Sequence, residues 1–191
     1  MIDFIYEKSQ SLTDDYCDTL IDYFEKNRID NSVYSLYDKN KVTFPLGSMV
    51  DNLKLPINFE NNKLIDELKQ HISLYFLKLD PDKKIFFFEN IFDKICIEDI
   101  LISKYKSGDC KINYHNDYQI NRDEGKQRVL KCVWYLNYLD EGGETEFFGN
   151  YCIKPEKGKL VIFPAEWFFP YTEKKSNIDK YIMTIWVYID A

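Results

Sequence analysis

The sequence predicts a mainly β protein with N-terminal helices, in which a double-sheet jelly roll carries the helices on one side. Three observations lead to this fold class. Two segments before residue 84 repeat apolar residues at helical spacing, and the residues from 85 onward form short apolar or alternating runs between turns. No internal repeat, low-complexity tract or Pro/Gly/Ser linker divides the 191 residues. We therefore expect one domain over 1–191, with a helical part over about 1–84 and a barrel over about 85–191.

The two predicted helices have recognisable ends. Thr13 is a suitable N-cap for a helix over 14–26, because Asp14 and Asp15 place negative charge at its positive end. A second helix is expected over 62–77 and should end before Pro81. Each carries one apolar stripe, so both should pack against a sheet.

The predicted strands are short and separated by turn residues. In the clearest one, Lys131 and Tyr135 share a face with Val129, Val133 and Asn137, since alternate residues of a strand point the same way. The strands are expected over 97–106, 111–115, 129–139, 144–148, 151–154, 159–163 and 181–189.

Composition limits the classes of partner and compartment. The formal net charge is −7, so the basic footprint of a general nucleic-acid binder is missing and no nucleic-acid partner is expected. No apolar run approaches a membrane span, and the first residues do not resemble a signal peptide. The five cysteines show no CxxC or CxxH spacing, which predicts reduced thiols in a cytoplasmic protein. They are Cys17, Cys96, Cys110, Cys132 and Cys152.

One short motif has the chemistry of a metal site. His115 and Asp117 lie two residues apart at the end of a predicted strand, so an imidazole nitrogen and a carboxylate can face one cation. Together they make two thirds of the 2-His-1-carboxylate triad of non-haem iron enzymes. The same pattern also fits a surface histidine beside a turn aspartate.

The motifs around this pair occur in an order that resembles the iron(II)/2-oxoglutarate dioxygenase superfamily, in its prolyl-4-hydroxylase-like branch. The resemblance covers residues 104–188 and implies a double-stranded β-helix, the cupin-like form of the jelly roll. It rests on YKSG at 105–108, YHND at 114–117, Arg128 followed by YLN at 135–137, GGETEF at 142–147, KGKLVIFP at 157–164 and KYIMTIW at 180–186.

The resemblance implies a role for each matching residue. His115 and Asp117 match iron ligands. Lys180 matches the basic residue that binds the far carboxylate of 2-oxoglutarate, and a buried carboxylate does need a paired cation. Two tyrosines match positions in the same cosubstrate pocket, and two further residues match positions at the pocket mouth, where they would touch the substrate. These four are Tyr105 and Tyr135, and Arg128 and Trp186.

The sequence departs from the family at the third iron ligand. The family places a second histidine about nine residues before the basic residue, and counting back nine from Lys180 arrives at Tyr171. The only other histidine, His71, is predicted to be an ordinary helix residue. The third ligand is therefore Tyr171, a water or absent. A tyrosine must lose its proton to bind iron, and the phenolate that results favours Fe(III) over Fe(II), so the exchange should slow turnover. Tyr171 could equally fill space in a barrel that no longer catalyses.

Two functions from different classes remain open. The first is an enzyme that uses Fe(II) and 2-oxoglutarate, with ascorbate as a candidate reductant. It would hydroxylate a peptide or protein side chain, or a small molecule, and release succinate and CO2. The second is a catalytically degenerate barrel that binds 2-oxoglutarate, metal or a peptide without turnover. A purely structural module is disfavoured, because it would not need to keep His115, Asp117 and Lys180.

Overall fold

The computed structural model describes residues 2–27, 50–55, 61–82, 84, 94–97, 100–108 and 113–190. A 3-10 helix (Ile2–Phe4) comes first, and α1 (Asp14–Asn27) and α2 (Asn61–Leu79) are the α-helices of this part of the chain. The larger of two antiparallel sheets has the order β1-β9-β6-β11-β4-β2, with β3 paired to β11 and β5 paired to β6. Its strands are β1 (Tyr6–Lys8), β2 (Val50–Lys54), β3 (Ile95–Ile97), β4 (Leu101–Tyr105), β5 (Ile120–Asn121), β6 (Lys126–Tyr135), β9 (Leu160–Pro164) and β11 (Lys180–Asp190).

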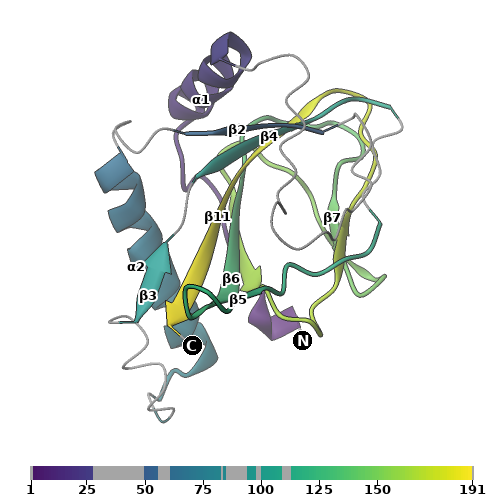
Figure 1. The fold of residues 1–191 in the computed structure, drawn as a ribbon. Coiled ribbons are helices and arrows are strands. Elements are labelled where there is room, and N and C mark those ends of the chain that lie inside the picture. The colour runs from purple at the N-terminus through teal and green to yellow at the C-terminus, as the bar shows by residue number, and fades with distance from the viewer. Residues whose placement is uncertain are drawn as a thin grey trace.

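The smaller sheet has the order β10-β7-β8 and faces the larger one. It consists of β7 (Thr145–Phe147), β8 (Tyr151–Ile153) and β10 (Tyr171–Glu173). In Figure 1, α2 lies beside the larger sheet on one side and β7 lies on the other. The predicted jelly-roll class with helices on one side is confirmed by this arrangement.

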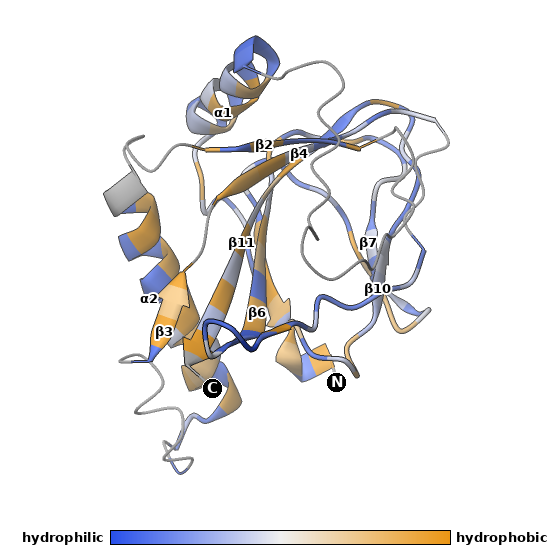
Figure 2. Cartoon of the chain, viewed as in Figure 1, coloured by the Kyte–Doolittle hydropathy of each residue, from blue (hydrophilic) through white to orange (hydrophobic). Residues whose placement is uncertain are grey.

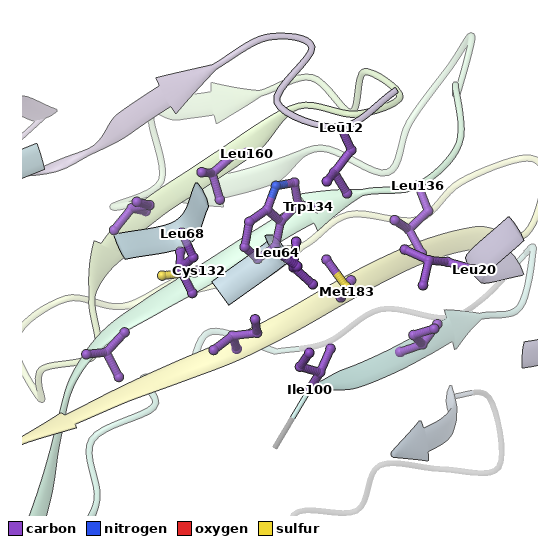
Figure 3. Packing of buried hydrophobic residues seen from close by; sticks show 14 of the residues in the cluster. Leu12, Leu20, Leu64, Leu68, Ile100, Cys132, Trp134, Leu136, Leu160 and Met183 are labelled. Carbon is purple, nitrogen blue, oxygen red and sulfur yellow. The ribbon is translucent and has the colours of Figure 1, made fainter. Parts of the chain in front are cut away.

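Alternation along the central strands divides the core into two layers. Cys132 and Trp134 of β6 pack with the helices in one apolar cluster, whereas Val133 and Tyr135 pack with the smaller sheet in another. Figure 3 shows Leu64 and Leu68 of α2 against the first pair. Figure 2 shows that α1 and α2 combine hydrophobic and hydrophilic residues, as expected for helices with one buried face. The second layer holds the chemistry-bearing residues.

Both predicted helices are present with small changes of boundary, and Thr13 Oγ1 accepts a 3.3 Å hydrogen bond from the Tyr16 amide as an N-cap. Within the described residues, no helix is long and apolar enough to cross a membrane. Four cysteines are free thiols, which are Cys17, Cys96, Cys132 and Cys152; Cys110 lies outside the described residues.

Several strand predictions need correction. The part before residue 84 is not purely helical, because β1 and β2 join the larger sheet. The predicted strand 97–106 is two elements, with β3 ending at Ile97 and β4 beginning at Leu101. Of the predicted strand 111–115, residues 111–112 lie outside the described part and His115 makes only an isolated bridge. The strands missed in the described part are β1, β2, β5 and β10. Of these, β1, β5 and β10 have three residues or fewer, too few to show periodicity, whereas β2 has five.

Candidate active site

His115 and Tyr171 are held together through their backbones. The two residues form an isolated antiparallel bridge, in which each amide donates to the other's carbonyl, at 3.0 and 2.9 Å. Their rings then lie 4.3 Å apart between centroids, and His115 Nε2 lies 2.9 Å from the Tyr171 hydroxyl. The main chain therefore places the histidine of the motif beside the tyrosine that stands at the predicted third-ligand position.

Asp117 completes this group although it is not on a strand. Its side chain is buried, and its Oδ2 lies 2.9 Å from the Tyr171 hydroxyl, which donates to it, and 3.2 Å from the donor Nε1 of Trp186. The distance from Asp117 Oδ1 to His115 Nε2 is 3.9 Å. The prediction that His115, Asp117 and Tyr171 converge on one point thus agrees with the geometry, while their role as ligands stays a prediction.

A fourth polar group in this place was not singled out from the sequence. Lys131 of β6 is buried, and its Nζ lies 2.9 Å from Asp117 Oδ2 and donates to the Tyr171 hydroxyl. The same ammonium lies 4.8 Å from the centroid of the Tyr171 ring. We call these five residues the His115 cluster: His115, Asp117, Lys131, Tyr171 and Trp186.

The signal for Lys131 was present in the sequence. It shares an alternating strand face with Val129, Val133 and Tyr135, and a lysine among such apolar and aromatic neighbours indicates a buried charge that needs a partner. Asp117 is that partner, but nothing local in the sequence connects the two.

Protonation in the cluster follows from burial and from Lys131. Burial raises the pKa of the Asp117 carboxyl, but the nearby Lys131 and His115 outweigh it and hold this pKa well below its usual range. Burial and the Asp117 charge raise the pKa of the Tyr171 phenol well above 10. Burial lowers the pKa of His115. At neutral pH Asp117 is therefore a carboxylate, Tyr171 a neutral phenol and His115 a neutral imidazole.

The hydrogen bonds of His115 define how the imidazole is oriented. Nδ1 lies 2.9 Å from the carbonyl of Asn113, which can only accept, so Nδ1 carries the proton. Nε2 therefore presents its lone pair to the Tyr171 hydroxyl, whose single proton can be donated either to Nε2 or to Asp117 Oδ2 at one time. This is the orientation that a metal-binding histidine also needs.

The predicted cosubstrate residues gather in a second buried group. The Nζ of Lys180 forms an ion pair with Glu173 and donates to the Gly143 carbonyl at 2.6 Å. Glu173 also accepts from Thr145 Oγ1, at 2.9 and 3.1 Å, and Thr145 Oγ1 is 2.7 Å from the Tyr135 hydroxyl. We call these five residues the Lys180 cluster: Tyr135, Gly143, Thr145, Glu173 and Lys180.

The chain geometry around Lys180 leaves little spare room. Gly143 has a φ of +72°, and a Cβ there would meet Leu139 Cδ1 at 2.3 Å and Lys180 Cδ at 3.5 Å. The positive φ favours glycine at this position, and an added Cβ would clash with Leu139 rather than with Lys180. The Tyr105 ring lies 5.8 Å from Lys180 Nζ, so the predicted Tyr105, Tyr135 and Lys180 do lie together.

Arg128 lies beside Trp186, the other residue predicted at the pocket mouth, and near enough to Asp117 for its charge to help lower the pKa of that carboxyl. Its guanidinium is 4.4 Å from the Trp186 ring centroid, and its Nε donates to the Tyr188 hydroxyl at 2.6 Å. All three side chains are buried. The predicted contact of Arg128 and Trp186 with a substrate is untested by this arrangement.

The arrangement does not fit a bound Fe(II) as it stands. The Tyr171 hydroxyl lies 2.9 Å from both His115 Nε2 and Asp117 Oδ2, but the Lys131 ammonium already neutralises Asp117 and would repel a dication beside it. In the described part of the chain, no three His, Cys, Asp or Glu side chains gather as a metal-binding group. The cosubstrate pocket does not fit 2-oxoglutarate either, because the Glu173 carboxylate already pairs with Lys180.

Comparisons with known proteins agree with the fold and the order of motifs. Residues 100–188 match the family model described as the 2OG-Fe(II) oxygenase superfamily. No curated protein matches the sequence significantly.

Three solved structures illustrate the similarity. A viral collagen prolyl hydroxylase from Paramecium Bursaria Chlorella virus-1, in its 2OG complex, has a TM-score of 0.66 at 22% identity, over 97% of this chain and 96% of that chain. A Pseudomonas putida prolyl-4-hydroxylase has a TM-score of 0.64 at 14% identity, over 96% and 91%. A Trichoplax adhaerens prolyl hydroxylase, in complex with a hypoxia inducible factor peptide fragment, has a TM-score of 0.64 at 15% identity, over 98% and 84%. Residues 100–188 therefore match the 2OG-Fe(II) oxygenase superfamily, and the chain has the fold of the prolyl hydroxylases.

Proposed function

We propose that this chain is a superfamily member that binds a peptide segment without turning over 2-oxoglutarate. The observation that carries the proposal is the 2.9 Å salt bridge between Lys131 and Asp117. Two unit charges 4 Å apart interact by about 4 kcal/mol at an effective dielectric of about 20, and a dication facing an ammonium is repelled by roughly twice that. Iron would have to displace Lys131, whose side chain is only 8% exposed.

The state of Tyr171 supports the same conclusion. Its pKa is raised well above 10 by burial and by Asp117, so the phenol keeps its proton. A tyrosine binds iron as phenolate, and burial beside a carboxylate opposes the loss of that proton. In this proposal Tyr171 is a hydrogen-bond bridge between His115, Asp117 and Lys131.

An exposed aromatic surface next to the His115 cluster is the proposed peptide site. Trp167 and Phe168 are 67% and 50% exposed, and their rings lie 5.5 Å apart, edge to face. Asn116 donates to the Trp167 carbonyl at 3.4 Å, which joins this surface to the segment carrying His115 and Asp117. Tyr118, at 37% exposure, follows on the same segment. Aromatic surfaces of this kind suit extended proline-containing peptides.

The occupant is proposed from the relatives. The solved structures are prolyl hydroxylases, one of which is in complex with a peptide fragment. We therefore propose a proline-containing peptide or protein segment as the partner, in the cytoplasm.

The second candidate function is an active dioxygenase that hydroxylates such a peptide. One observation favours it: the 2.9 Å separations from Tyr171 Oη to His115 Nε2 and to Asp117 Oδ2. Neighbouring ligands of one octahedral ion with bonds of about 2.1 Å are about 3 Å apart. His115 and Asp117 would hold the iron, which supplies the oxygen chemistry of the family, and Lys180 and Tyr135 would hold 2-oxoglutarate.

The experiment that separates the two functions measures iron and succinate together. The wild-type protein is loaded anaerobically with Fe(II), then given oxygen, ascorbate and 2-oxoglutarate, with and without a proline-rich peptide. We expect substoichiometric iron and no succinate above a protein-free blank. Catalytic release of succinate would establish the second function and end the first.

The binding half of the proposal has its own measurement. Fluorescence anisotropy of a labelled proline-rich peptide should give a saturable signal that Trp167→Ala weakens at least about tenfold, because exposed tryptophans dominate such interfaces. Tyr138→Ala is the control, because Tyr138 is also exposed, at 56%, but follows the C-terminal end of β6. Trp167 instead follows β9, whose last residue, Pro164, pairs with Leu130 in the first half of β6. Equal weakening by both variants, or no binding by the wild type, would remove the proposed peptide surface.

A further inference from the structure

Glu173 occupies the position where a carboxylate ligand of Lys180 would be held. The two side chains form an ion pair, and both residues are almost completely buried, at 3% and 1% exposure. Thr145 Oγ1 donates to the same carboxylate. A cation and a hydroxyl are the groups that a carboxylate site offers, and here one of the chain's own side chains fills it.

The backbone makes this contact a fixed part of the fold. Glu173 is on β10, where it pairs in register with Thr145 of β7, and it lies two residues after Tyr171 on the same strand face. Lys180 begins β11 and pairs in register with Tyr105 of β4. Each partner of the ion pair is thus placed by a strand of the core.

From this geometry we infer that Glu173 is a built-in occupant of the carboxylate site that the family uses for 2-oxoglutarate, so that the site is closed to free cosubstrate. A second carboxylate would bring two like charges onto one buried ammonium, which disfavours binding. The inference deepens the proposed function, but it rests on Glu173 and Lys180 and needs neither iron nor Lys131.

A consequence is that the carboxylate site can be opened by mutation. Glu173→Ala leaves Lys180 with a cavity in place of its counter-ion, and a small carboxylate such as formate or acetate can fill that cavity. The variant should therefore acquire a binding site for free carboxylates that the wild-type protein lacks.

The test uses the full chain in EDTA, so that metal plays no part. Thermal unfolding and titration calorimetry are carried out with formate, acetate or 2-oxoglutarate against sodium chloride of equal ionic strength. The wild type should respond to none of them. Glu173→Ala should lose about 10 °C in Tm, as expected when a buried pair is broken, and should regain part of it saturably with formate or acetate.

Two further variants keep the result interpretable. Glu173→Gln preserves the side-chain volume without the charge, so it should be destabilised but should not respond to carboxylates. The double variant Glu173→Ala/Lys180→Met removes the cation as well and should lose the response of the single variant. If Glu173→Ala alone does not fold, the titration of the metal-free wild type with 2-oxoglutarate still decides the inference.

Each outcome decides one statement. Binding of 2-oxoglutarate to the metal-free wild type, lost in Lys180→Met, would overturn the inference, as would a Glu173→Ala protein that folds and ignores carboxylates. If the wild type binds no 2-oxoglutarate but loads Fe(II) stoichiometrically, Glu173 closes the carboxylate site but Lys131 does not exclude iron. If the wild type binds 2-oxoglutarate but no iron, Lys131 excludes iron but Glu173 does not close the carboxylate site.

Discussion

Lys131 and Asp117 form a salt bridge of 2.9 Å inside the barrel, with each side chain 8% exposed. They come from β6 and from the segment after His115, and Tyr171 bonds to both. Buried pairs of this kind contribute little net stability compared with apolar residues, but removing one partner is costly. The pair therefore matters most for what it excludes, which is a second cation at the same place.

Lys131→Met should destabilise the protein and create affinity for a divalent cation. It leaves the Asp117 carboxylate buried without its ammonium, which costs about 3–5 kcal/mol of the free energy of unfolding. Urea denaturation measures this loss, and Mn(II) should restore part of it, because the cation then binds the folded state alone.

The matched control for Lys131→Met is Lys126→Met on the same strand. Lys126 is 32% exposed and pairs with Glu124 at 3.4 Å, so its loss should change stability by about 1 kcal/mol or less, without a response to Mn(II). A Lys131→Met protein as stable as the wild type and indifferent to Mn(II) would contradict the role given to this lysine.

Restoring the missing histidine should not restore activity by itself. Tyr171→His supplies a second imidazole beside His115 and Asp117, but Lys131 and Glu173 still fill the cation and carboxylate positions. We expect no release of succinate from this single variant. The triple variant Tyr171→His/Lys131→Ala/Glu173→Ala should convert 2-oxoglutarate to succinate in an Fe(II)-dependent way. Turnover by Tyr171→His alone would show that the two charges do not block the site.

Leu68→Ala tests whether the helices and the sheets unfold as one domain. Leu68 is fully buried in the cluster that joins α2 to β6, so the change should cost about 2–5 kcal/mol. Circular dichroism at helix wavelengths and tryptophan fluorescence should shift together in urea. Leu74→Ala, on the exposed side of the same helix at 49% exposure, should change little. Separate transitions for the two signals would argue for two units.

His71 should make the protein less stable in mild acid. It links α2 to Tyr6 and Ser11 through both ring nitrogens, at 3.1 and 3.3 Å, and burial followed by the charge of Lys8 lowers its pKa, against a smaller opposite effect of Glu67. The unfolded chain then takes up a proton near pH 6.5 more readily than the folded one. The contribution of His71 to the free energy of unfolding is therefore fully present above about pH 6.5. It is lost as the pH falls towards the lower pKa of His71 in the folded state.

The measurement is Tm between pH 7.5 and 5. His71→Gln should reduce the fall of Tm between pH 7.5 and 5. Part of that fall should remain, because burial also lowers the pKa of His115. An unchanged slope in His71→Gln would mean that this histidine does not contribute.

The sequence by itself determined the fold class, both helices and the identity of three residues at the centre. His115 and Asp117 were recognisable because the motif is local, and Tyr171 was located by its distance of nine residues from Lys180. These predictions succeeded because alternation, helical periodicity and motif order are properties of neighbouring residues.

Only the tertiary structure decided which charges meet. Lys131 lies 14 residues from Asp117 along the chain, and Glu173 contacts Thr145 through the register of β10 on β7. Neither contact follows from local pattern, because a charged residue on a strand face has the same sequence signal whichever partner it finds. The pairing of strands distant in sequence places one ammonium against Asp117 and one carboxylate against Lys180. Since buried charges must be neutralised where they lie, that pairing decides whether the two positions are open to iron and cosubstrate or already filled by the chain.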